Sequence, residues 1–293
     1  MIGLTAAAFA LALQASPPVG DSSGQAPEVV VAGVRQSDRQ VRDFVGALTK
    51  APVHGQLSRF HLGVCPAVVG VSAATSALIT ARMRRVAEAA GVRGGPARCT
   101  PNALVLIARD KRDLIERMYR KYPDFFTGIS VRDVRRLAAQ PSRAAAWHVE
   151  GLLNRDGLEI PRDLLSGYYV SEATDSPSRL TPPTRPHFIA SVLVIELRAL
   201  EGLTTTQVAD YAAMRTFARA GPAQLANSSA PTILSIIDAP IDSAVPVTMT
   251  RWDIGFLNAL YRSSADRFAN QQRSEIQTLV RRDVQRPRGE KDE

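Results

Sequence analysis

Apolar side chains recur every three or four residues in several segments, which is the spacing of one face of an α-helix. This pattern predicts helices over residues 37–48, 73–90 and 205–219. Residues of N-cap type stand at the start of four expected helices: Asp110, Ser130, Thr204 and Thr250. At the last three, an acidic or amide side chain follows three residues later, as in a capping box. The pattern therefore indicates several amphipathic helices with well-marked beginnings.

Other segments alternate between apolar and polar residues, or are continuously apolar, which is typical of strands. The predicted strands cover residues 28–34, 60–64, 103–108, 145–153 and 188–200. Residues 103–108 are apolar throughout, so we expect them in the centre of a sheet. Because strands and helices are mixed along the chain, we predict the α+β class and one domain over residues 28–262. Residues 263–293 are expected to form a polar helical tail.

Residues 2–13 are apolar and uncharged. Their length matches the core of a signal peptide and is too short to span a bilayer, which takes about 20 residues. We predict a signal peptide over residues 1–15 and a Pro/Gly/Ser-rich linker over residues 16–27. This predicts a periplasmic or secreted protein with no transmembrane span in the mature chain. Because no Lys or Arg precedes the apolar core, a buried N-terminal helix is the alternative.

Cys65 and Cys99 are the two cysteines of the chain. Neither belongs to a Cys-x-x-Cys pair, and no histidine lies at metal-ligand spacing from them. In an exported protein they predict one structural disulfide, which would close a loop around the helix at residues 73–90. In a protein that is not exported, we expect two buried free thiols instead.

The positive charge is concentrated in one region. The net charge is +8, and residues 82–143 hold 15 Lys/Arg against 6 Asp/Glu. A basic face attracts anions such as acidic lipid, cell-wall polymer or nucleic acid, although an ordinary solvated face is the alternative. The candidates for this basic surface are Arg82, Arg85, Lys111, Arg117, Arg120 and Lys121. Aromatic residues do not alternate with these cations, so we expect no nucleic-acid partner.

The chain lacks the H-E-x-x-H, G-x-S-x-G, Walker and dinucleotide-binding motifs. Its histidines do not pair on one helix face, so we expect no metal site and no cofactor. By residue type, the candidates for catalysis are His148, Glu150, His187, Glu196 and Glu201, and a catalytic site is expected around the first three. Side chains alternate along a strand, which places His148 and Glu150 on one face, where a glutamate can orient a histidine as general base. The alternative is a polar strand face exposed to solvent.

The last third of the chain combines a long strand, a capped helix over residues 205–219, the segment PTILSIID and the pattern Thr250-Arg-Trp-Asp253-x-x-Phe256-Leu257. This combination resembles a secreted proteobacterial family of unknown function with a zincin-like layout. The whole chain resembles uncharacterised exported proteins of alphaproteobacteria through its Cys65-Pro66 and Cys99-x-Pro101-Asn102 signatures.

An active zincin carries its metal ligands and its general base on one helix. If the helix over residues 205–219 is its counterpart, the corresponding positions are Gln207, Val208 and Tyr211. Val cannot act as a base, and Gln and Tyr are poor zinc ligands. The resemblance therefore implies a scaffold that lacks the metal site, and it implies no substrate.

Three functions remain open at this point. The first is a non-catalytic exported protein that binds an anionic envelope component, or another envelope protein, through the basic region. The second is a periplasmic hydrolase with a site around His148, Glu150 and His187. The third, a cytoplasmic nucleic-acid binder, requires that residues 1–15 are not a signal peptide.

Overall fold

The computed structural model describes residues 26–49, 55–163, 167–170, 181–240 and 243–285, with side chains from Ser37 onward. The predicted signal peptide and most of the predicted linker lie outside the described residues, as does His54. The chain divides into two units, Met1–Gln36 and Ser37–Glu293. The second unit carries the sheet, the core and all the candidate residues.

The described residues form seven α-helices and one four-stranded mixed sheet, which confirms the predicted α+β class. The strands are β1 (Pro66–Val69), β2 (Ala103–Ala108), β3 (Ala144–Leu153) and β4 (Arg185–Glu196). The helices are α1 (Ala26–Leu48), α2 (Ala73–Ala89), α3 (Lys111–Lys121), α4 (Val131–Ala139), α5 (Thr205–Phe217), α6 (Arg251–Arg262) and α7 (Ala269–Gln285). No helix in these segments is both long and apolar enough to cross a membrane.

All four predicted N-caps are confirmed. The side chains of Asp110, Ser130, Thr204 and Thr250 each accept a hydrogen bond from a backbone N–H in the first turn of α3, α4, α5 and α6, respectively. These bonds satisfy donors that the helix itself leaves unpaired, which fixes where each helix begins.

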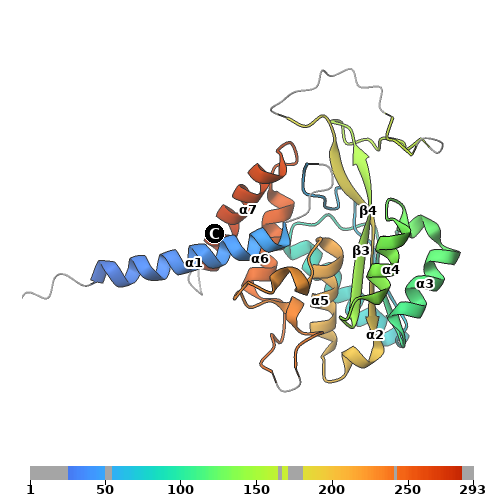
Figure 1. Cartoon of the computed structure of the whole chain (residues 1–293), viewed down its shortest axis with the longest axis horizontal. Helices are drawn as coiled ribbons and strands as arrows, with labels where there is room; N and C mark the ends of the chain where they lie inside the picture. Colours follow the sequence, from blue (N-terminus) through green and yellow to red (C-terminus); the bar gives the residue numbers. More distant parts are fainter. Residues whose placement is uncertain (1–25, 50–54, 164–166, 171–180, 241–242, 286–293) are drawn as a thin grey trace, which may run out of the picture. The chain divides into compact units, whose positions relative to one another are not determined.

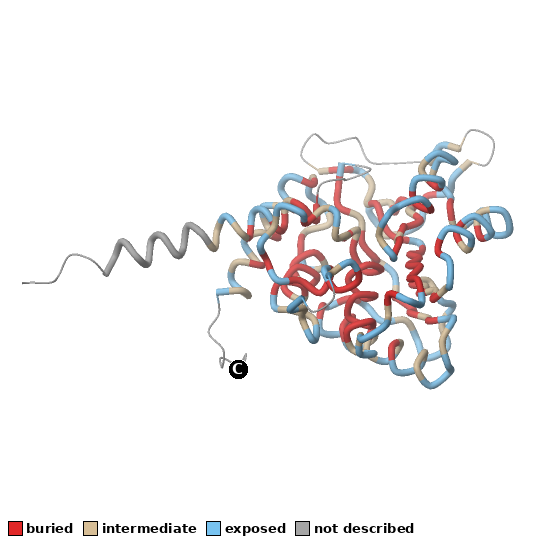
Figure 2. The backbone as a smooth tube through the Cα atoms, turned by 60° about the horizontal axis from the view of Figure 1, so that its bottom comes forward, coloured by how far each residue is buried: buried red, intermediate tan, exposed pale blue. Residues whose placement is uncertain are grey.

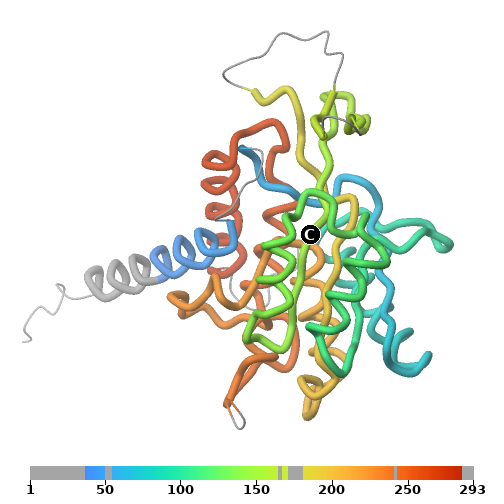
Figure 3. Tube along the Cα trace, turned by 45° about the vertical axis from the view of Figure 1, so that its right-hand side comes forward, coloured from blue at the N-terminus to red at the C-terminus, as the bar shows by residue number. Residues whose placement is uncertain are grey.

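The strand order in the sheet is β1-β2-β4-β3. The first three strands in this order are parallel, and β3 pairs antiparallel with β4. β2 is an internal strand, as predicted. Helices α3 and α4 cover the sheet face that carries Trp147 and Val192, whereas α2 and α5 pack on the face that carries Val105 and Leu193. Figures 1 and 3 show the resulting helix layers on either side of the sheet.

Two apolar clusters hold these layers together, and Figure 2 shows the buried segments in red. In the larger cluster, the ring of Phe44 from α1 meets that of Trp252 at 5.4 Å. The predicted tail is helical as α7, and its Ile276 and Val280 are fully buried in this cluster. In the smaller cluster, between the sheet and α3–α4, the ring of Phe126 stacks on Trp147 at 4.9 Å.

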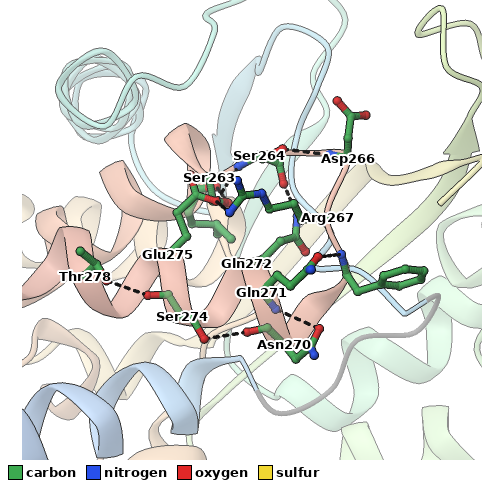
Figure 4. Close-up of polar contacts among 12 residues, drawn as sticks. Ser263, Ser264, Asp266, Arg267, Asn270, Gln271, Gln272, Ser274, Glu275 and Thr278 are labelled. Atoms are coloured by element: carbon green, nitrogen blue, oxygen red, sulfur yellow. Dashed lines mark hydrogen bonds and ion pairs between the residues drawn. The ribbon is translucent and has the colours of Figure 1, made fainter. Parts of the chain in front are cut away.

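Side-chain hydrogen bonds fix the turn between α6 and α7 (Figure 4). The backbone N–H of Ser264 donates to Glu275 Oε2 at 3.2 Å, and Gln272 Nε2 donates to the Ser264 carbonyl at 2.9 Å. Buried Arg59 donates to the carbonyl of Leu260 and, at 3.0 Å, to the hydroxyl of Ser263. The turn therefore anchors the segment that precedes β1.

The predicted strand over residues 28–34 is wrong, because these residues belong to helix α1. The run is rich in β-branched residues, which favours a strand locally. However, Val30, Val34 and Val41 keep the helical spacing that continues to Leu48. The period of the whole segment outweighs the propensity of its first residues.

The predicted strand over residues 60–64 is also wrong. This segment makes only isolated bridges at its ends, Arg59 with His187 and Val64 with Gly94. Its alternating pattern is typical of a strand, but no described strand pairs with it along its length. Leu62, expected to be buried, is 47% exposed.

Candidate functional site

Cys65 and Cys99 form a disulfide, as predicted, with 6.0 Å between their Cα atoms. Cys65 precedes β1 and Cys99 lies between α2 and β2, so the bridge closes a loop around α2. Asn102 supports the same junction, since its Oδ1 accepts from the Cys65 N–H at 2.7 Å and its Nδ2 donates to the Gly63 carbonyl at 3.0 Å. A structural disulfide is compatible with an exported protein.

A cavity of about 440 Å³ beside β3 is lined by two of the three catalytic candidates, His148 and Glu150. Arg219, which follows α5, forms a salt bridge with the Glu150 carboxylate, whose side chain is only 8% exposed. The strand register shifts between Val149 and Glu150, which marks a β-bulge next to the cavity. Glu150 is therefore held by Arg219 and does not orient His148.

His148 is buried, and its Nε2–H donates to the carbonyl of Thr216 in α5 at 3.2 Å. Its ring lies 4.2 Å from that of Phe188, centroid to centroid. The alternative expectation of a solvent-facing polar strand face is wrong, because His148 is buried against α5 and the Glu150 side chain is only 8% exposed. Burial lowers the pKa of His148 to about 3, and the charge of nearby Arg219 acts in the same direction. His148 is therefore a neutral residue that joins β3 to α5.

This burial predicts a loss of stability in acid. Below pH 6.5 the unfolded chain protonates His148, whereas the folded chain does so only near its lowered pKa of about 3. The stabilising contribution is thus present above pH 6.5 and is lost as the pH falls. Between pH 7 and pH 5 the loss from this residue is about 2 kcal/mol.

Urea unfolding of the wild type and of His148→Gln at both pH values measures this loss. The glutamine amide can still donate to Thr216 but does not titrate, so the variant should lose about 2 kcal/mol less than the wild type on acidification. His61, whose pKa burial also lowers to about 3, provides a background that both proteins share. Equal losses in the two proteins would contradict the assignment.

The third candidate, His187, lines a second cavity of about 360 Å³. The two cavities share several walls, among them Glu150, Arg162 and Tyr169. In the described chain, no hydrogen bond joins any two of the three catalytic candidates, and no nucleophile is bonded to His148 or His187. The side chains are neighbours around adjoining cavities, but they do not form a catalytic dyad.

Glu159 is an acidic residue close to His187 that was not predicted as part of the site. Its Oε1 lies 3.8 Å from His187 Nε2. Glu159 lies beyond the end of β3 and is brought back by an isolated bridge with Leu153. No periodicity or motif marks such a residue in the sequence.

Two of the predicted basic-surface residues are structural. Lys111 is 3% exposed, because its Nζ reaches inward and donates to the carbonyls of Gln140 at 2.7 Å and Ser142 at 2.9 Å. Arg82 forms a salt bridge with the fully buried Asp210, with 2.7 Å between Nε and Oδ1. The prediction of Lys111 as a surface cation is therefore wrong, whereas the side chain of Arg82 is 29% exposed but has its charge paired with Asp210.

The remaining predicted cations are exposed. Arg117 pairs with Asp113 at 2.8 Å, and Arg85 lies on α2. Arg120 and Lys121 lie at the end of α3, next to further exposed cations that the prediction did not single out. We define the basic face by five exposed side chains without an ion pair in the described residues: Arg112, Arg120, Lys121, Arg132 and Arg135.

Most acidic residues of this layer already have partners. Asp110 caps α3, Asp113 pairs with Arg117, and Asp133 accepts a hydrogen bond from the Ser130 hydroxyl and pairs with Arg136. Glu116 and Asp124 are the acidic side chains of α3, η1 (Pro123–Phe126) and α4 that lack such a role in the described structure. Five cations thus face two unpaired carboxylates, which leaves the outer surface of α3–α4 electropositive.

The helix compared above with a zinc helix is α5. Gln207 is buried, and its Nε2 donates to the Pro246 carbonyl at 2.9 Å. The hydroxyl of Tyr211 accepts from Arg215 at 2.5 Å. Across the described residues, no group of three or more His, Cys, Asp or Glu side chains is placed to hold a metal ion.

Comparison with known proteins adds no assignment. No family model, no curated protein and no solved structure matches the chain.

Proposed function

We propose that this protein is a non-catalytic exported protein that binds an anionic component of the cell envelope through the basic face. The observation that carries the proposal is the set of five exposed cations on α3 and α4 without acidic partners among the described residues. The ligand chemistry is a surface or polymer with repeated phosphate or carboxylate groups. Such groups satisfy several cations at once, whereas a single small anion meets only one or two.

The two helices form a rigid support for these cations. Their inner faces are fixed in the core through Ile115, Met118, Val134 and Leu137. Arg120 and Lys121 lie in the last turn of α3, where the helix dipole also favours positive charge. Binding to this face therefore requires no rearrangement of the fold.

Binding is tested by sedimentation with vesicles of phosphatidylglycerol and phosphatidylcholine, and in a separate experiment with soluble polyphosphate. We expect binding to the mixed vesicles, to polyphosphate or to both, and no binding to vesicles of pure phosphatidylcholine. The probe that binds shows whether the anionic groups belong to a lipid surface or to a polymer. Raising the salt from about 0.1 M to about 1 M shortens the screening length from roughly 10 Å to roughly 3 Å and should release the protein.

The triple variant Arg112→Gln, Arg120→Gln, Arg132→Gln should bind roughly 100-fold more weakly, since each cation near an anionic surface contributes about 1 kcal/mol. A matched control removes the same charge from exposed positions on α1 and α7: Arg39→Gln, Arg42→Gln, Arg282→Gln. The control should keep nearly full affinity. Equal loss in the two triple variants, or binding that salt does not weaken, would sink the proposal.

The disulfide supports the exported location, because such bonds persist in oxidising compartments. Mass spectrometry of the protein recovered from its own host tests this part. We expect a chain that lacks residues 1–15 and whose mass is lower by two hydrogens. A full-length chain with two free thiols would contradict export and would favour the nucleic-acid alternative.

A further inference from the structure

His187 is a buried imidazole whose Nε2 has no hydrogen-bond partner in the described residues. The residue is 1% exposed. Most buried polar side chains in folded proteins have partners, so an unpaired one indicates a place for a group from outside the chain. Nε2 faces the cavity of about 360 Å³ beside β3 and β4, which is a volume in the range of small-ligand sites.

Access to Nε2 depends on Gly151 and Glu159. Gly151 pairs with His187 across the two strands, and a Cβ atom at position 151 would lie 2.8 Å from Nε2. The Glu159 carboxylate lies over the same nitrogen at 3.8 Å, which is too long for a hydrogen bond. This side chain is 58% exposed, so it can rotate outward and admit one polar atom between itself and the imidazole.

The charges around the cavity select a neutral ligand. Glu150 is paired with Arg219, and the cavity lining also carries one carboxylate, Glu159, and one exposed guanidinium, Arg162. Burial lowers the pKa of His187, so the imidazole is uncharged at neutral pH. An anion would be repelled by the Glu159 carboxylate, and an ammonium would be repelled by the Arg162 guanidinium.

A neutral hydroxyl can accept a hydrogen bond from the imidazole N–H at Nε2 while it donates its own hydrogen to a carboxylate, so it can bridge the two groups. Ile160 and Ile189 add an aliphatic wall to the cavity, and the Tyr169 hydroxyl is fixed beside it by donating to the Glu150 carbonyl at 3.0 Å. We propose that this cavity binds a saccharide unit, with one hydroxyl bridging His187 Nε2 and the Glu159 carboxylate and an apolar ring face against Ile189. The site is separate from the basic face, and either proposal can fail alone.

The test follows the full chain labelled with ¹⁵N histidine and ¹⁵N glycine by NMR while glucose, N-acetylglucosamine, acetate or ethylamine is added. We expect at least one of the two sugars to shift the His187 Nε2 and Gly151 signals in a saturable manner. Acetate and ethylamine should leave both signals in place, because the cavity is balanced in charge.

Two variants locate the site. Glu159→Ala should weaken sugar binding about tenfold or more, because a hydrogen bond to a charged group is lost. Glu201→Ala, at another exposed glutamate, is the matched control and should leave binding unchanged. Gly151→Ala places a methyl group against His187 Nε2 and should abolish the shifts. Thermal unfolding shows whether this variant folds. If it does not fold, Glu159→Ala still tests the proposal, because Glu159 is exposed and its loss should not affect folding. No saturable sugar response, a response to acetate or ethylamine alone, or sugar binding that Glu159→Ala leaves unchanged would overturn the proposal.

Discussion

Replacing Arg82 by alanine should lower the free energy of unfolding by about 3 kcal/mol, although the residue lies in the basic region of the sequence. The Asp210 carboxylate is fully buried, and Arg82 meets it with two nitrogens, at 2.7 Å and 3.1 Å. Removing one partner of a buried ion pair leaves the other charge unpaired, which typically costs about 3–5 kcal/mol. We expect the lower end, because Thr248 and the Met249 N–H still donate to Asp210.

Urea unfolding of Arg82→Ala and Arg85→Ala measures the effect with a matched control. Both arginines lie on α2, but Arg85 is exposed, and its loss should change the stability by less than about 0.5 kcal/mol. Adding Asp210→Asn to Arg82→Ala removes the buried charge, so the double variant should be more stable than the sum of the single changes implies. Similar stability of Arg82→Ala and Arg85→Ala would show that the ion pair is not structural.

The features that could be predicted from the sequence are those that local physics determines. The N-caps at Asp110, Ser130, Thr204 and Thr250 act within one helical turn, so the residue types alone indicate them. The internal strand β2 is apolar throughout because both of its faces are covered. These short-range signals suffice for the α+β class.

The site features could not be predicted because their partners lie far away in the sequence. Arg82 and Asp210 are 128 positions apart, and Glu150 and Arg219 are 69 apart. An arginine that binds a buried carboxylate has the same local pattern as one that faces solvent. For the same reason His148, on an alternating strand, could not be distinguished from a solvent-facing residue until α5 covered it.

Removing the disulfide should lower the free energy of unfolding by roughly 3–4 kcal/mol. Cys65 and Cys99 are 34 positions apart, and a bridge across a loop of this length restricts the unfolded chain by that amount. The native packing of the segment before β1 against the segment before β2 should survive without the bridge. The side chain of Asn102 hydrogen-bonds to the backbone of Cys65 and of Gly63 and holds the two segments together. We therefore expect a folded but less stable protein in reductant, and the same for the double variant Cys65→Ala, Cys99→Ala.

Urea unfolding with and without reductant separates the bridge from other effects of the change. Reductant should shift the midpoint of the wild type and leave that of the double variant unchanged, because the variant has no other cysteine to reduce. The variant should also match the reduced wild type to within about 1 kcal/mol, since burial of two small side chains changes little besides the bridge. A loss below about 1 kcal/mol would mean that the bridge does little to restrict the unfolded chain. The bridge would then contribute little to stability, and only its presence in the protein from its own host would bear on the exported location.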